Sequence, residues 1–171
     1  MARYRIKQFY WAVTSYFTKL DEAYIDKYLQ EEEKELFNML STGDKHHCVR
    51  VAKTAEEYYY QIKRDYPQLN TSLEEVMKIA LLHDIGKIVH PLNILKKSLI
   101  VLLNKVSSGR LKKLSRIDSI YIYYYHPMEG VKLLRKLGYD ENFLYAVEKH
   151  HEYIESNNIL LNILRYADNK N

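Results

Sequence analysis

Apolar residues recur at intervals of three and four along most of the chain, the spacing that places them on one face of an α-helix. Between residues 5 and 40 this pattern predicts two helices that are broken near Asp21. The same pattern predicts further helices over residues 45–64, 72–85, 91–103, 118–137, 140–151 and 158–168. We therefore expect an all-α fold, a helical bundle of about seven to nine helices.

Local signals mark where several of these helices begin and end. N-caps are predicted at Asp44, at Thr71 or Ser72, and at Asp140. Gly86 is predicted to end the helix that precedes it, because glycine is common just after the last helical residue. Pro127 is predicted either to kink the helix that carries it or to open a new one. Residues 121–125, four of them tyrosines, have strand propensity, but we favour a helix with its aromatic side chains in the core.

Composition narrows the class of protein. A chain of 171 residues is most simply one domain, and its 5 glycines and 3 prolines are too few for an all-β fold. The net charge of +4 permits an anionic ligand without requiring nucleic acid, so no nucleic-acid partner is expected. The single cysteine excludes an intramolecular disulfide. No segment has the apolar length of a membrane span, and the first residues are a poor signal peptide, so a cytoplasmic protein is expected.

Histidines and aspartates form an ordered set of candidate metal ligands. The dipeptide His83-Asp84 ends an apolar run, so one helix end can supply two ligands. The whole set is His47, His83, Asp84, His126, His150, His151 and Asp168. Imidazole and carboxylate together suit first-row transition metals better than magnesium or calcium. We expect two divalent ions, iron or manganese, with zinc or nickel as alternatives, and Asp84 as the bridge because a carboxylate can join two cations.

The motifs around these residues resemble those of the HD-domain superfamily of metal-dependent phosphohydrolases. They are His-Cys-Val-Arg-Val-Ala at 47–52, Leu-His-Asp-Ile-Gly-Lys at 82–87, His-Pro-Met-Glu-Gly at 126–130, His-His-Glu at 150–152 and Leu-Arg-Tyr-Ala-Asp at 164–168. The match covers about three quarters of the chain, and its order is most similar to the HDIG and HD-GYP branches, whose sites hold two metals.

The resemblance implies a domain plan and a role for each residue. Residues 41–171 would form one HD-type domain, with residues 1–40 as a helical extension packed on it. The first metal would be held by His47, His83, Asp84 and Asp168. Asp84 would bridge to a second metal held by His126, His150 and His151. Lys87 would bind the substrate phosphate, so that Asp84 and Lys87 are the expected catalytic residues.

The function that follows is hydrolysis of a nucleotide or a phosphodiester by metal-activated hydroxide. Two alternatives remain open: a nucleotidase or phosphatase with one metal, and a non-catalytic module that senses a nucleotide. The expected partner is a small phosphorylated molecule. The sequence leaves the oligomeric state open, and a homodimer is compatible with it.

The chain also departs from the HD-GYP branch. Where that branch continues into a loop with Gly-Tyr-Pro, residues 153–158 contain neither glycine nor proline, which argues against hydrolysis of cyclic di-GMP. Gly43 stands four residues before His47, where a glutamate could hold a third metal. Cys48 adjoins His47, but core packing is favoured over ligation because adjacent helical side chains point in different directions. The basic residues between 105 and 116 either funnel an anionic substrate or form a solvated loop.

Overall fold

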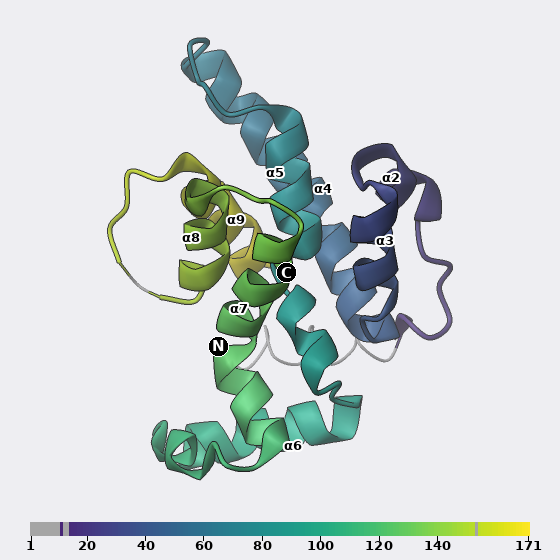
Figure 1. Cartoon of the computed structure of the whole chain (residues 1–171), viewed down its shortest axis with the longest axis vertical. Helices are drawn as coiled ribbons and strands as arrows, with labels where there is room; N and C mark the ends of the chain where they lie inside the picture. The colour runs from purple at the N-terminus through teal and green to yellow at the C-terminus, as the bar shows by residue number, and fades with distance from the viewer. Residues whose placement is uncertain (1–10, 12–13, 153) are drawn as a thin grey trace.

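The computed structural model describes residues 11, 14–152 and 154–171 (Figure 1). This part of the chain contains eight α-helices and two short 3-10 helices, and no strand. The α-helices are α2 (Glu22–Tyr28), α3 (Glu31–Asn38), α4 (Thr42–Asp65), α5 (Leu73–Leu82), α6 (Ile94–Val106), α7 (Asp118–Lys136), α8 (Glu141–Lys149) and α9 (Ile159–Lys170). The 3-10 helices are η1 (Ile85–Val89) and η2 (Arg110–Leu114). The predicted all-α fold is confirmed, while the first predicted helix falls largely on residues outside the description.

The break predicted near Asp21 is present, and a second break follows it. The Asp21 side chain accepts a hydrogen bond from the backbone N–H of Tyr24 and caps α2. The single helix expected after Asp21 is divided, because Gln30 and Glu33 form a capping box that starts α3. Helices α2 and α3 pack against α5. The domain boundary at residue 41 stays a prediction.

The start of α4 corrects the predicted N-cap. The cap is Ser41, whose hydroxyl accepts a hydrogen bond from the backbone N–H of Asp44 at 3.3 Å. The helix therefore begins at Thr42 and not at Lys45, and Asp44 lies inside its first turn. Its carboxylate is free to bind other side chains and is almost fully buried.

The end of α5 corrects the predicted role of Gly86. Ser72 caps this helix with Glu75 in a capping box, and its last residue is Leu82. His83 and Asp84 form the junction with η1, and Gly86 lies within η1 without a positive φ. Its lack of a side chain serves a tertiary contact instead. A Cβ at Gly86 would lie 1.9 Å from the carbonyl oxygen of His126 in α7.

One main core lies where α4, α5, α8 and α9 pack together, with η1 against α7 (Figure 1). Residues 121–125 are helical, as predicted, and Pro127 lies inside the continuous helix α7. A second, smaller core of Ile100, Leu111 and Ile120 joins α6 and η2 to the first half of α7. We name residues 94–117 the α6–η2 lobe; it lies at one end of the molecule (Figure 1).

None of the helices in the described residues is both long enough and apolar enough to cross a membrane.

Candidate metal centre

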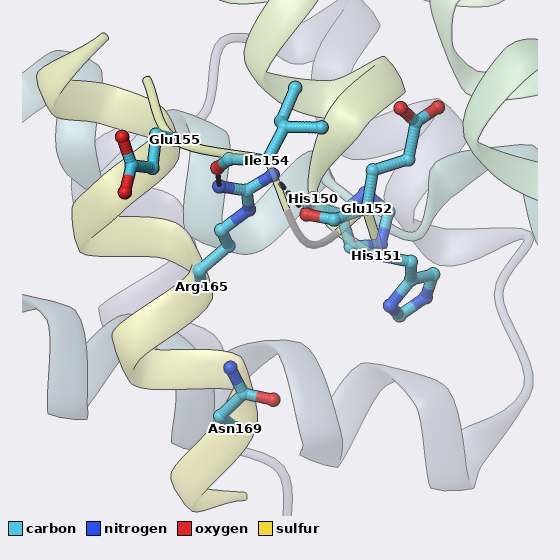
Figure 2. A pocket seen from close by; sticks show the side chains of 7 residues that line it. All are labelled: His150, His151, Glu152, Ile154, Glu155, Arg165 and Asn169. Atoms are coloured by element: carbon cyan, nitrogen blue, oxygen red, sulfur yellow. Dashed lines mark hydrogen bonds between the residues drawn. The ribbon is translucent and has the colours of Figure 1, made fainter. Parts of the chain in front are cut away.

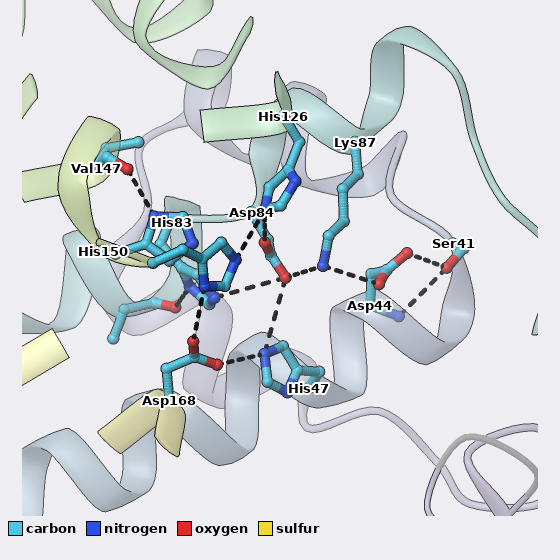
Figure 3. A network of polar contacts seen from close by, with 12 residues as sticks. Ser41, Asp44, His47, His83, Asp84, Lys87, His126, Val147, His150 and Asp168 are labelled. Atoms are coloured by element: carbon cyan, nitrogen blue, oxygen red, sulfur yellow. Dashed lines mark hydrogen bonds and ion pairs between the residues drawn. The ribbon is translucent and has the colours of Figure 1, made fainter. Parts of the chain in front are cut away.

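Five separate parts of the fold deliver the seven predicted ligands to one place (Figure 3). Helix α4 carries His47, the α5–η1 junction carries His83 and Asp84, α7 carries His126, the end of α8 carries His150 and His151, and α9 carries Asp168. Their ligand atoms fall into two groups, each within 4.8 Å: Asp84, His126, His150 and His151; and His47, His83 and Asp168. The structure thus brings together every residue that the sequence predicted as a ligand.

Asp84 lies between the two groups and is only 1% exposed. Its Oδ1 is 3.1 Å from Nε2 of His126. Its Oδ2 is 3.5 Å from Nε2 of His83 and 3.7 Å from Nε2 of His47. The two oxygens of one carboxylate therefore face different groups of imidazoles, which is the arrangement that a bridging ligand requires.

Each group is also joined internally by a close contact. His47 Nε2 lies 3.1 Å from an oxygen of Asp168. His126 Nε2 lies 3.1 Å from His151 Nε2, and two ring nitrogens at this distance share at most one proton.

A further group of candidate ligand atoms, from Cys48, His83 and Asp84, also lies within 4.8 Å. Cys48 is fully buried, and burial raises the pKa of its thiol, which disfavours the thiolate that binds metals.

Three imidazoles are oriented by backbone carbonyls. Nδ1 of His83 donates to the Ala80 carbonyl at 2.9 Å, and Nδ1 of His126 to the Ile122 carbonyl at 3.0 Å. Nδ1 of His150 donates to the carbonyl of Val147 at 2.6 Å. With the proton on Nδ1, each Nε2 presents a lone pair toward the centre, which is how metal-binding histidines are held.

The donor atoms of the site fit a metal ion. Nε2 of His83 and Nε2 of His150 are buried, and neither has a hydrogen-bond partner. An unsatisfied buried nitrogen is costly, and a cation bound to its lone pair removes that cost. Burial lowers the pKa of both imidazoles, so they stay in the neutral form that ligation needs.

Lys87 connects the centre to a second carboxylate. Its ammonium group donates to Oδ2 of Asp84 and lies 3.5 Å from Oδ1 of Asp44 (Figure 3). The same Asp44 oxygen accepts a hydrogen bond from Lys97 of α6 at 2.9 Å, and Ser41 donates to the other oxygen. Burial would lower the pKa of Lys87, but Asp84 and Asp44 outweigh that effect and raise it, so Lys87 is a cation at the edge of the site.

Asp44 is the site residue that sequence reasoning missed. The local sequence around Asp44 predicts a helix cap, and no short-range pattern connects Asp44 with Lys87 or Lys97. In the structure it is 5% exposed and anchors both ammonium groups. Asp44 therefore holds Lys87 in place beside the ligands.

Replacing Asp44 with asparagine should lower the free energy of unfolding by about 1–3 kcal/mol, since two ammonium groups lose their shared carboxylate. Burial opposes ionisation of Asp44, but Lys97 and Lys87 prevail and hold its pKa well below the usual value. A carboxyl whose pKa is depressed by folding stabilises the protein above its unfolded pKa of about 3.9 and loses that effect as the pH falls.

Urea unfolding of the wild type and the Asp44→Asn variant, at neutral pH and below about pH 4, tests this pH dependence. The difference should be largest at neutral pH and should shrink in acid. Asp26→Asn is the matched control, because that carboxylate is mostly exposed and pairs only at the surface. An Asp44 variant as stable as this control at neutral pH would contradict the anchoring role.

A shallow pocket opens beside the centre (Figure 2). His150, His151, Glu152, Ile154, Glu155, Arg165 and Asn169 line it. Arg165 of α9 donates to the carbonyl of Ile154 at 2.7 Å and to that of Lys149 at 3.1 Å, and it also binds the Glu152 carbonyl. Arg165 therefore links α9 to the end of α8 and to the backbone of Glu152 and Ile154.

The two remaining histidines lie outside both ligand groups. They are His46 and His90, and His90 has a 3.7 Å contact with Asp118. Gly43 carries no side chain toward the ligands. The basic residues between 105 and 116 lie in and around η2, in the α6–η2 lobe, and not among the ligands.

Comparison with known proteins supplies one match. The sequence profile of the HD domain family matches residues 45–170, which is most of the chain and includes all seven candidate ligands. No curated protein and no solved structure matches the chain.

Proposed function

We propose that this chain, which belongs to the HD domain family, uses a two-metal site to hydrolyse a nucleotide or another phosphodiester. The family indicates a metal-dependent phosphohydrolase; the number of metals and the substrate are the parts that we propose. The observation that carries the proposal is the position of Asp84, whose two oxygens face the two ligand groups.

The distances support a division of the ligands between two ions. His47, His83 and Asp168 would hold one ion and His126, His150 and His151 the other, with Asp84 common to both. Such a pair of ions, iron or manganese in the first instance, supplies Lewis acidity and a nucleophile that is available near neutral pH.

The chain's own side chains would do the remaining work. Lys87 is cationic and lies at the edge of the ligand cluster, so it can bind a phosphoryl oxygen and offset the negative charge that develops there. Asp44 positions that ammonium group from the side away from the ligands. His151, with a half-exposed side chain, lies between the cluster and the open pocket, which gives a substrate a route of approach.

Metal analysis tests the number of ions. Protein purified without added metal or chelator should carry close to two transition-metal ions per chain, measured by mass spectrometry. The variant His126→Ala should carry close to one and should lose more than about 100-fold of its phosphodiesterase activity. His90→Ala is the matched control, since this histidine lies outside both ligand groups.

If the His126→Ala variant keeps its full activity, the two-metal mechanism is wrong, and the alternative of a phosphatase with one metal is supported. If the wild-type protein carries no metal after reconstitution with iron and manganese but binds nucleotides tightly, the alternative of a non-catalytic module that senses a nucleotide is supported.

A further inference from the structure

Helix α6 presents an apolar face to solvent. Leu95, Leu99, Leu102 and Val106 follow one another at intervals of four, three and four residues, so they lie in one stripe along the helix. Their exposed fractions are 76%, 56%, 58% and 76%. The buried face of α6 is a different one, since Ile100 is 5% exposed and packs with Leu111 and Ile120. Four large apolar side chains in one exposed row indicate a surface that meets another apolar body.

The same part of the chain is strongly basic. Residues 94–117 contain seven lysines and arginines and no aspartate or glutamate. They are Lys96, Lys97, Lys105, Arg110, Lys112, Lys113 and Arg116, and of these Lys97 pairs with Asp44. The net charge of the whole chain is +4 and that of this segment is +7, so the rest of the chain is net negative and the positive charge is concentrated here.

Two lysines flank the apolar stripe of α6. Lys96 and Lys105 lie on either side of the apolar stripe by helical phase, and both are exposed. Beyond the helix, Leu114 and Ile117 are 54% and 52% exposed among the arginines and lysines of the lobe. An apolar stripe flanked by lysines is the design of a helix that lies in the interface of a lipid bilayer.

We propose that the α6–η2 lobe docks the protein on the surface of a membrane that contains anionic lipids. The leucines would enter the boundary of the acyl chains, while the lysines and arginines would meet the lipid phosphates. The lobe lies at one end of the molecule, away from α2, α3 and α8 (Figure 1), so a flat surface can reach it. This inference does not depend on the chemistry of the metal site.

Charge argues against one alternative partner, and the apolar stripe argues against another. A second copy of the chain, packed through the same face, would bring two strongly basic lobes together, which costs energy at physiological salt. A nucleic acid would satisfy the basic residues but would leave the leucines in water. An anionic bilayer would bind the basic residues and also bury the exposed leucines.

Vesicle co-sedimentation tests the proposal with the full chain. The protein should sediment with vesicles of phosphatidylcholine and phosphatidylglycerol, and should bind vesicles of phosphatidylcholine alone at least about tenfold more weakly. The double variant Leu99→Gln/Leu102→Gln should lower binding to the anionic vesicles at least about tenfold, because two apolar side chains no longer enter the bilayer. Lys112→Gln/Lys113→Gln should also weaken binding and reduce its dependence on salt.

Met39→Gln is the matched control, since Met39 is an equally exposed apolar residue outside the lobe. Thermal unfolding followed by circular dichroism verifies that each variant is folded, as expected for changes at exposed side chains. Three results would overturn the proposal: no binding to anionic vesicles, equal binding of the wild type and the leucine variant, or a dimer in solution that the leucine variant abolishes. Binding to an oligonucleotide but not to vesicles would assign the basic residues to a nucleic acid instead.

Discussion

Replacing Gly86 with alanine should lower the free energy of unfolding by about 3 kcal/mol or more and should impair metal binding. The added Cβ would lie 1.9 Å from the carbonyl oxygen of His126 and 2.5 Å from the backbone nitrogen of Gly130. Both obstacles are backbone atoms, so no side-chain rotation relieves the clash. The η1 segment and α7 would have to separate, which would move His83 and Asp84 away from His126.

Gly130 supplies the matched control for this prediction. It lies on the α7 side of the same contact, but a Cβ there would meet its nearest atom at 3.4 Å, which is an ordinary contact. Alanine is also the better helix former, so Gly130→Ala should be neutral or stabilising. Urea unfolding and metal content should be compared in the two variants. Equal stability of Gly86→Ala and Gly130→Ala would contradict the close-contact explanation.

Replacing Asp84 with asparagine should abolish phosphohydrolase activity and reduce metal content below one ion per chain. The substitution keeps the size of the side chain but removes the negative charge that both ligand groups face. An amide is a poor bridge between two cations and leaves three neighbouring imidazoles, those of His47, His83 and His126, without their central anion. We expect a loss of activity greater than about 1,000-fold, because in the proposed two-metal site the variant would affect both ions and not one.

Asp168→Asn separates this effect from a general loss of carboxylate charge. One oxygen of Asp168 lies 3.1 Å from Nε2 of His47, in whose ligand group it belongs, and the other lies farther, 3.8 Å, from Nδ1 of His151. Its variant should keep more metal than Asp84→Asn, as measured by mass spectrometry of the purified proteins. If Asp168→Asn and Asp84→Asn lose metal to the same extent, Asp84 is not the shared ligand.

The sequence predicted most of the helices, and it identified the seven candidate ligands that the fold brings together, because both depend on local patterns. Helical periodicity needs only neighbouring residues, and the ligands stand in recognisable motifs. The role of Asp44 needed contacts with residues 43 and 53 positions away, which no local pattern contains. Gly86 was predicted to end a helix because only its neighbours in the sequence were considered. The structure explains the glycine by its close contact with the backbone of α7.

The α6 helix shows a different limit of sequence reasoning. Its apolar spacing identified it as a helix, yet Leu95, Leu99 and Leu102, which established the pattern, form its exposed face. Periodicity shows that residues share a face but not what that face contacts. The side that packs inward is marked by Ile100, which a single sequence does not distinguish from its neighbours.

The contact at Gly86 also makes the α6–η2 lobe a module. The chain leaves the metal centre just after Lys87 and returns to it at His126, and the neighbouring Gly86 lies against the backbone of His126. The two ends of the intervening segment are therefore fixed by the core, whatever the length or surface of the segment between them. A different segment, with a different exposed surface, could therefore be inserted between these two points while His83, Asp84 and His126 keep their positions.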